Sequence, residues 1–229
     1  MSDLAHMRRA LRLAERGRGQ VSPNPLVGAV VTRGSAVVGE GAHRHFGQAH
    51  AETEALARAG SAARGATLYV TLEPCAHHGH TPPCADAVVA AGVARVVCAL
   101  QDPDPRVAGR GLERLRAAGI AVEVGLCQAA AEEQNAAFLK HRHTGRPLVL
   151  LKLGQSLDGR IATRTGASRW ITGEAARRHA HRWRSWVDAV AVGAGTVLAD
   201  DPRLNVRLVR GRDPRPLVVD GRLRVSPEA

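Results

Sequence analysis

Residues 66–91 read ATLYVTLEPCAHHGHTPPCADAVVAA, and this stretch decides the fold expected of the chain. It begins with Ala66–Leu72, an apolar run that is typical of a buried strand. It ends with Cys84–Ala91, which predicts a helix that begins at a cysteine. Between the two, Pro74-Cys75 opens a loop rich in histidine and proline. The stretch therefore predicts a strand, a cysteine-bearing loop and a helix in succession, which is a building unit of α/β proteins.

Other strands and helices alternate on both sides of this unit. The N-terminal helix is expected to be capped by Ser2 and Asp3, with Gly17 and Gly19 beyond its end. A strand hairpin over residues 27–32 and 36–40, with its turn at Gly34, follows it. Further strands are expected over residues 95–100 and 121–124, and further helices over 50–59, 111–118 and 129–143. This alternation predicts a layered α/β sandwich whose sheet is mostly parallel after the initial hairpin.

A domain boundary is expected at Thr144-Gly145-Arg146-Pro147, where the helical pattern ends and a new apolar strand begins. Residues 1–145 then form the first domain and residues 146–229 the second. In the second, strands are expected over residues 148–153, 189–192 and 216–220, and a helix over 174–187. This segment shows no evident closing element, so we expect an incomplete domain.

Three side chains of metal-binding type lie at the starts of two expected helices and after the strand. His50 begins one helix, Cys75 follows the strand and Cys84 begins the next helix. One imidazole and two thiolates make three protein ligands for zinc, and an open fourth position is typical of catalytic zinc sites. Soft thiolates with one imidazole suit zinc best among the divalent metals. The pattern predicts a catalytic zinc site.

Glu52 is the candidate proton carrier at this site. It lies two residues after His50, so on the first helical turn it points to a different side and is free to act as a base. Such a carboxylate can take a proton from water and pass it to a ring nitrogen and then to a leaving amine. His-x-Glu followed by Pro-Cys-x-x-Cys is the signature of zinc deaminases, although eight residues, 76–83, separate the two cysteines here. The expected chemistry is hydrolytic deamination of an amino-substituted heterocycle.

Each of these signals also has a structural interpretation. His-x-Glu is frequent, the two cysteines could be core thiols, and the histidines of the insert could lie on the surface or bind a structural zinc ion. These histidines are His77, His78 and His80. The catalytic interpretation is favoured because the strand and both helices that the deaminase motif requires are expected at the right places. Cys98 and Cys127 lie in or just after apolar strands and are expected to be core or near-core thiols and not ligands.

Composition limits the other classes of function. No apolar run reaches the ~18 residues of a membrane span and no signal block opens the chain, so a cytoplasmic protein is expected. The four cysteines are then thiols or ligands and not disulfides. The net charge is +11, and residues 146–229 contribute most of it, with 16 basic and 8 acidic side chains. Because only six aromatic side chains are available to stack on bases, a phosphate-bearing small molecule is favoured over nucleic acid as partner.

The motifs resemble those of the riboflavin-biosynthesis bifunctional deaminase–reductase (RibD) family. The resemblance is carried by His50-Ala51-Glu52, by residues 71–84 (TLEPCAHHGHTPPC) and by residues 101–105 (QDPDP). The long insert that ends in Thr-Pro-Pro-Cys separates this family from cytidine and tRNA-editing deaminases. The likeness extends from the first helix to about Asp220.

For residues 1–145, the resemblance implies a cytidine-deaminase-like three-layer sandwich with a mixed sheet. It implies deamination of 2,5-diamino-6-(5-phosphoribosylamino)pyrimidin-4(3H)-one to 5-amino-6-(5-phosphoribosylamino)uracil. The implied site residues are His50, Cys75 and Cys84 for zinc, Glu52 for proton transfer and Asn24 for the substrate ring. Asn24 has an equally good interpretation as a turn residue between two prolines. The histidine-rich insert lies where a phosphoribosyl group could be received.

For residues 146–229, the resemblance implies the start of a dihydrofolate-reductase-like α/β domain that reduces the ribosyl ring to a ribityl chain with NADPH. It is carried by residues 152–159, 168–172 and 193–202. The implied cofactor contacts are Gly154, Trp170, Thr196 and Asp200, and the implied substrate contacts are Ser168, Arg184, Leu204 and Arg207. Both arginines can bind a phosphate bidentately, or can be solvated surface charges. Because the family's domain continues well beyond this segment, we expect deaminase activity from the chain and reductase activity only with a further segment supplied.

Two other interpretations stay open. The first is a deaminase that acts on a nucleoside, a base or tRNA, against which the widened insert and residues 152–201 argue. The second is a structural zinc module or basic nucleic-acid binder, against which Glu52 argues, because a closed zinc site needs no carboxylate base. Self-association to a homo-oligomer is expected, since an incomplete sheet exposes an unpaired edge.

Overall fold

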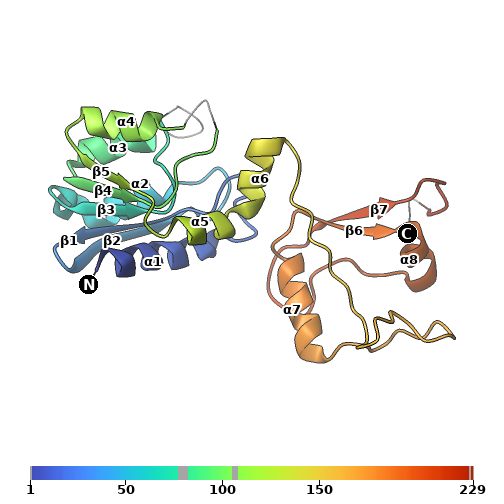
Figure 1. Cartoon of the computed structure of the whole chain (residues 1–229). Coiled ribbons are helices and arrows are strands. Elements are labelled where there is room, and N and C mark those ends of the chain that lie inside the picture. The colour runs from blue at the N-terminus through green and yellow to red at the C-terminus, as the bar shows by residue number, and fades with distance from the viewer. Residues whose placement is uncertain (1, 77–81, 105–107, 227, 229) are drawn as a thin grey trace. The chain divides into compact units, whose positions relative to one another are not determined.

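The computed structural model describes residues 2–76, 82–104, 108–226 and 228, and it divides into two compact units, residues 1–148 and 149–229. The strands of the first unit are β1 (Gly28–Arg33), β2 (Ala36–Ala42), β3 (Thr67–Val70), β4 (Arg95–Cys98) and β5 (Ala121–Val124). They form one sheet in the order β2-β1-β3-β4-β5 (Figure 1). Strand β1 is antiparallel to β2 and β3, whereas β3, β4 and β5 are parallel. The expected α/β class and mixed sheet are confirmed.

Helices cover both faces of this sheet (Figure 1). One face carries α1 (Asp3–Ala14), with the short 3-10 helix η1 (Glu15–Gly17), and α5 (Gln128–Gln134). The other face carries α2 (Ala51–Ala59), continued by η2 (Gly60–Ala63), then α3 (Cys84–Ala91) and α4 (Arg110–Ala117). The first unit is therefore a three-layer sandwich.

Two glycines let helices lie directly on the strands. At Gly28 in β1, a Cβ atom would lie 2.0 Å from the carbonyl oxygen of Ala10 in α1. At Gly41 in β2, a Cβ atom would lie 2.0 Å from the carbonyl oxygen of Ala51 in α2. Gly28 pairs with Ala42, and neighbouring residues of a strand face opposite sides, so the two approaches are on opposite faces of the sheet. The second approach fixes the start of α2, where His50 lies.

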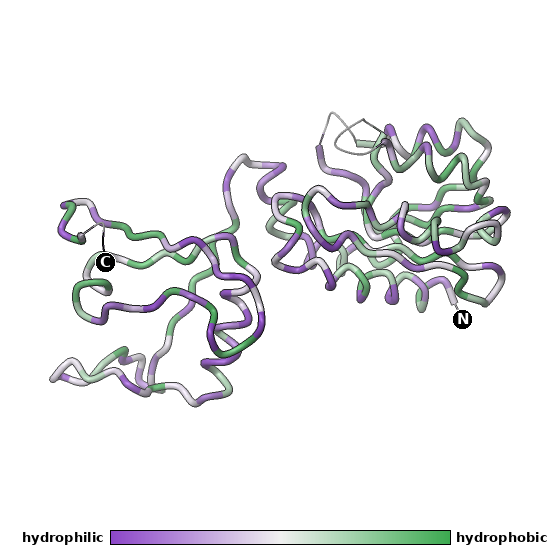
Figure 2. The backbone as a smooth tube through the Cα atoms, turned by 180° about the vertical axis from the view of Figure 1, so that it is seen from behind, coloured by the Kyte–Doolittle hydropathy of each residue, from purple (hydrophilic) through white to green (hydrophobic). Residues whose placement is uncertain are grey.

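The central strands are buried on both faces, which is why they are continuous runs of small and β-branched residues. Val30, Leu68 and Val96 are each fully buried. Cys98 is also fully buried, as expected of a core thiol. By contrast, hydrophilic and hydrophobic residues alternate along α1, near the N-terminus in Figure 2, because only one side of this helix faces the sheet.

Two expectations about helix ends are wrong. The side chain of Ser2 makes no capping hydrogen bond, and Asp3 instead accepts hydrogen bonds from Tyr69 and Arg95, each at 2.7 Å. The single helix expected over residues 129–143 is broken at Asn135 into α5 and α6 (Ala136–Thr144). Asn135 has φ −105° and ψ 18°, outside the helical region, because its buried side chain bonds to another part of the chain.

The second unit contains α7 (Glu174–Arg184), β6 (Ala189–Gly193), α8 (Ala194–Asp200) and β7 (Arg215–Val219), with β6 and β7 parallel. The expected strand over residues 148–153 is not formed, since no strand in the described part of the chain pairs with it. Its leucines are exposed, Leu151 at 84%. Across the described ranges, no helix is both long and apolar enough to cross a membrane.

We predict that Gly41→Ala lowers the free energy of unfolding of the first unit by about 1–3 kcal/mol, because the added methyl group collides with the backbone of α2. Denaturant unfolding measures this change. The control is Glu40→Ala on the same strand, which removes an ion pair with Arg9 and should cost less than about 1 kcal/mol. Equal losses in the two variants would contradict the packing argument.

Candidate metal centre

The three predicted ligands meet beyond the carboxyl end of β3. His50 is the residue immediately before α2, Cys84 is the first residue of α3, and Cys75 lies in the segment that follows β3. One ligand atom from each lies within 4.8 Å of the others. Ligands at the carboxyl ends of strands and the N-termini of helices are typical of sites in α/β sheets.

The distances suit a single tetrahedral ion. His50 Nδ1 lies 3.0 Å from Cys84 Sγ and 3.7 Å from Cys75 Sγ. With Zn–N near 2.0 Å and Zn–S near 2.3 Å, tetrahedral ligands of one ion are separated by roughly 3.5 Å. The backbone N–H of Cys84 also donates to Cys75 Sγ at 3.3 Å, which stabilises a thiolate there. These residues fit zinc with Nδ1 of the histidine as the nitrogen ligand.

The charges at the cluster favour thiolate beside imidazole. A hydrogen bond with Cys84 and another with His50 lower the pKa of Cys75 well below its usual value. The same contact between the sulfur atoms, together with burial, raises the pKa of Cys84. The hydrogen bond with Cys75 raises the pKa of His50. Of the two sulfur atoms, Cys75 Sγ is therefore the one that the surroundings favour as a thiolate, and binding of a divalent cation would favour the thiolate form of both.

Glu52 lies beside the cluster without belonging to it. Its carboxyl group is buried, with the residue 3% exposed, and it contacts the thiol of Cys84. Burial raises the pKa of Glu52 to about 7, partly offset by the neighbouring imidazole of His50. A carboxyl group with this pKa can both take and give a proton near neutral pH.

Asn24 and His43 are hydrogen-bonded to each other, and the His43 ring packs against the ring of His50. His43 Nδ1 donates to the carbonyl oxygen of Ala49 at 3.1 Å, so its Nε2 accepts from Asn24 Nδ2 at 3.2 Å. Burial lowers the pKa of His43, which keeps the ring neutral and this pattern intact. Among the described residues, the Oδ1 atom of Asn24 is then the part of its amide that remains available to a ligand. No sequence pattern indicates His43, because a histidine seven residues before a candidate ligand belongs to no general motif.

Glu73 holds the loop that carries Cys75. Its buried carboxylate accepts hydrogen bonds from the backbone N–H groups of Asp102, Gly109 and Gly111, at 3.1, 3.0 and 2.9 Å, and a longer one from Leu112. This joins the end of β3 to the start of α4. Glu73 belongs to the 71–84 motif, but its role depends on partners that lie 29 to 39 residues further along the chain.

Other expected parts of the site are only partly described. The insert histidines, His77, His78 and His80, lie outside the described residues. Asp104, from the 101–105 motif, receives a hydrogen bond from Arg142 of α6 at 3.4 Å. Cys127, expected as a core or near-core thiol, is half-buried at the start of α5 and packs against the core.

In the second unit, three of the four predicted substrate residues lie together. Arg184 donates to the carbonyl oxygens of Arg203 and Asn205, on either side of Leu204. Arg207 donates to the same carbonyl of Arg203 at 3.2 Å. Burial, and then the like charge of Arg207, lower the pKa of Arg184. A pair of guanidinium groups held this way can bind an anion.

The remaining predicted residues are spread over the second unit. Ser168 lies in a loop just before Trp170, and the guanidinium of Arg177 lies 4.3 Å from the centre of the Trp170 ring. Gly154 lies in the irregular segment 146–156, and Thr196 and Asp200 belong to α8. No hydrogen bond joins these residues to the arginine pair in the described part of the unit.

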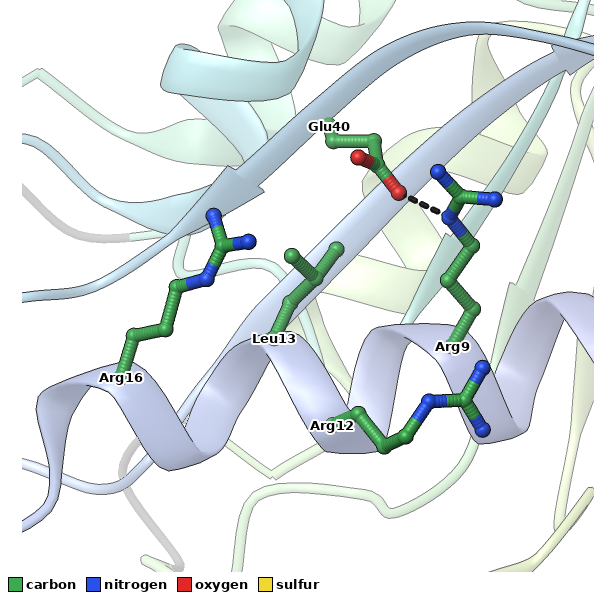
Figure 3. Close-up of a pocket in the computed structure, with 5 residues that line it drawn as sticks. All are labelled: Arg9, Arg12, Leu13, Arg16 and Glu40. Atoms are coloured by element: carbon green, nitrogen blue, oxygen red, sulfur yellow. Dashed lines mark hydrogen bonds and ion pairs between the residues drawn. The ribbon is translucent and has the colours of Figure 1, made fainter.

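A surface hollow between α1 and β2 is separate from this centre. It is lined by Arg9, Arg12, Leu13, Arg16 and Glu40, and the ion pair of Arg9 with Glu40 crosses it (Figure 3). None of the predicted site residues lines it.

We predict that Cys84→Ser lowers the zinc content of the purified chain from about one ion per chain to a small fraction of that, because a hydroxyl group is a poor zinc ligand. Elemental analysis after dialysis measures the content. Cys127→Ser is the matched control, since Cys127 is a free thiol outside the cluster. Loss of zinc from the control alone would contradict the assigned ligands.

We predict that Glu73→Ala destabilises the first unit by roughly 2–4 kcal/mol, because several buried N–H groups lose a charged acceptor. Thermal unfolding measures the effect. Glu113→Ala, at an exposed position of α4, should stay within about 0.5 kcal/mol of the wild type. A Glu73 variant as stable as this control would contradict the anchoring role.

Family models match both the N-terminal and the C-terminal part of the chain. Residues 1–100 match the cytidine and deoxycytidylate deaminase zinc-binding region, and residues 147–229 match the RibD C-terminal domain. The riboflavin biosynthesis protein RibD of Escherichia coli (strain K12) is 51% identical over 240 residues, covering 99% of this chain and 65% of the relative. The protein of the same name from Bacillus amyloliquefaciens is also 51% identical, covering 98% of this chain and 61% of the relative.

Solved structures agree with this match. Acinetobacter baumannii RibD, form 1, superposes with a TM-score of 0.93 at 49% identity, covering 98% of this chain and 65% of the other. The diaminohydroxyphosphoribosylaminopyrimidine deaminase/5-amino-6-(5-phosphoribosylamino)uracil reductase of Thermotoga maritima superposes with a TM-score of 0.94 at 43% identity, covering 99% and 65%. The chain thus spans less than two thirds of the length of these relatives. By motif, sequence and structure alike, the chain belongs to the RibD family.

Proposed function

We propose that the first unit catalyses a step of riboflavin biosynthesis, the zinc-dependent hydrolytic deamination of 2,5-diamino-6-(5-phosphoribosylamino)pyrimidin-4(3H)-one to 5-amino-6-(5-phosphoribosylamino)uracil. The observation that carries the proposal is the convergence of one imidazole, two thiols and a buried carboxyl group beyond β3. The matches to RibD proteins support the choice of substrate, since the Thermotoga maritima relative is named for this deaminase.

The chain's own residues account for the proton transfers. When bound by His50, Cys75 and Cys84, zinc supplies Lewis-acid activation of a water molecule. Glu52 takes a proton from the water at a carboxylate oxygen and gives it to the ring nitrogen next to C2, while the water oxygen bonds to C2. Glu52 then takes the remaining hydroxyl proton and gives it to the amino group, which leaves as ammonia. Both water protons are accounted for, and Glu52 returns to its starting form.

Asn24 is the residue that we assign to substrate orientation. Because Nδ2 of Asn24 donates to His43, Oδ1 is the acceptor atom of this amide that we assign to the substrate. An acceptor at this place suits an N–H group of the pyrimidine ring. A deaminase for a nucleoside or tRNA would use the same zinc chemistry, so substrate choice rests on the RibD match of the whole chain and not on the zinc ligands.

For the second unit we propose the first part of an NADPH-dependent reductase domain. The match of residues 147–229 to the RibD C-terminal domain favours it. Gly154, Trp170, Thr196 and Asp200 are assigned to the cofactor, and Ser168, Arg184, Leu204 and Arg207 to the substrate. The arginine pair held on the carbonyl of Arg203 supports a phosphate-binding role.

A small phosphorylated pyrimidine, and not nucleic acid, is the proposed partner. Self-association to a homo-oligomer is also part of the proposal, supported by the fully exposed strand β7. Sedimentation of the purified chain tests the second point, and a species at the mass of a single chain at all concentrations would contradict it.

We predict that Glu52→Gln lowers the rate of ammonia release from the diaminopyrimidine phosphate by about 10²–10⁴-fold, because the amide cannot carry protons. The zinc content should stay unchanged, since Glu52 is outside the ligand cluster. The control is Glu133→Gln at an exposed position of α5. Ammonia release at the wild-type rate from the Glu52 variant would show that the proton-carrier role is wrong.

We predict that NADPH oxidation with the deaminated product as substrate depends on residues beyond those of this chain. Strand β7 is exposed along all five residues, and residues 148–153 form no strand, so the cofactor and substrate residues lack a complete sheet behind them. The test compares this chain with one extended by the remaining third of the Escherichia coli relative. Equal oxidation rates for the two proteins would contradict the prediction.

A further inference from the structure

Asn135 joins two parts of the first unit that are 109 residues apart in sequence. The backbone N–H of Leu26 donates to Asn135 Oδ1 at 2.8 Å, and Asn135 Nδ2 donates to the carbonyl oxygen of Leu26 at 3.0 Å. Asn135 is 3% exposed and lies between the two regions that match family models. The oxygen and the nitrogen of the buried Asn135 amide thus both bond to the backbone of Leu26.

Leu26 lies two residues after the turn Val21–Asn24, which carries Asn24. The turn is closed by a hydrogen bond from the backbone N–H of Asn24 to the carbonyl oxygen of Val21, at 2.8 Å. From Asn24 the contacts continue through His43 to the carbonyl oxygen of Ala49, the residue before the ligand His50. The backbone N–H of His43 also donates to Val27, the residue after Leu26, at 3.0 Å. The hydrogen bonds of Asn135 therefore hold the backbone of Leu26, which lies next to the segment that contacts Asn24 and His43.

The role of Asn135 is not that of a helix cap. It interrupts the helical stretch between α5 and α6, yet its side chain makes no capping hydrogen bond to α6. A residue chosen only to break a helix needs neither a buried donor nor a buried acceptor. An asparagine whose amide matches the N–H and C=O of one extended residue is instead suited to fixing that residue in place.

We propose that Asn135 is a positioning residue for substrate recognition, because it holds Leu26 so that Asn24 keeps the orientation in which its Oδ1 faces the pyrimidine. This inference rests on the proposed deaminase function. It gives the junction of α5 and α6 a role in substrate recognition. This junction lies outside the deaminase family match, which ends at residue 100.

The matched control is the neighbouring residue Gln134. Its side-chain N–H group also donates to a distant backbone carbonyl, that of Leu11 at 2.9 Å, but this contact anchors α1 and not the Asn24 turn. Gln134→Ala and Asn135→Ala therefore each remove a side-chain contact to the backbone from the same helix junction. Asn135→Ser, which keeps a short polar group but cannot span to both groups of Leu26, replaces the alanine variant if the latter does not fold.

The experiment measures KM and kcat for ammonia release, together with zinc content and amide hydrogen exchange at Leu26. We expect Asn135→Ala to raise KM about tenfold, with kcat within about twofold and zinc unchanged, because one pair of buried hydrogen bonds is lost. Exchange at Leu26 should become faster in this variant and stay unchanged in Gln134→Ala. In an Asn24→Ala background, the Asn135 substitution should add no further rise in KM, since its effect passes through Asn24.

An unchanged KM in Asn135→Ala, an equal rise in Gln134→Ala, or a full additional rise in the Asn24→Ala background would each overturn the proposal. Absence of ammonia release from the wild-type chain would instead contradict the proposed function itself. The two failures are therefore distinguishable by the wild-type measurement alone.

Discussion

The close approach of His50, Cys75 and Cys84 is the constraint on which the rest of the first unit depends. Three donors from separate elements reach a common point only if α2 and α3 begin at the same end of the sheet as the carboxyl end of β3. The missing side chain at Gly41 lets α2 lie against β2, which sets where His50 falls. The metal centre is thus a consequence of helix–sheet packing as much as of ligand chemistry.

Buried polar contacts hold the loops around this centre. Glu73 gathers backbone N–H groups from the start of α4, and Asn135 fixes the backbone of Leu26. Hydrogen bonds to buried backbone groups are costly to leave unmade, so each of these side chains constrains a loop more tightly than an apolar contact of the same area would. The catalytic candidate Glu52 is itself buried, and its raised pKa follows from that burial.

The two units differ in how far they bury their apolar residues. In the first, the central strands are covered by helices on both faces. In the second, Leu151 and the residues of β7 are exposed, and the arginine pair of Arg184 and Arg207 rests on carbonyl oxygens of an irregular loop. A parallel sheet of two strands cannot bury both of its faces, which agrees with the fact that the relatives are longer than this chain.

The sequence by itself determined the order of strands and helices in the first unit and the three candidate metal ligands, because hydrophobic periodicity and ligand type are local properties. It did not determine that the helix over residues 129–143 breaks at Asn135, or that residues 148–153 form no strand. It also did not indicate the hydrogen bonds that His43 makes beside His50, or those that Asn135 makes to Leu26. These features depend on hydrogen-bond partners far away in the chain, and only the tertiary structure decides which distant groups a buried amide, imidazole or strand edge will meet.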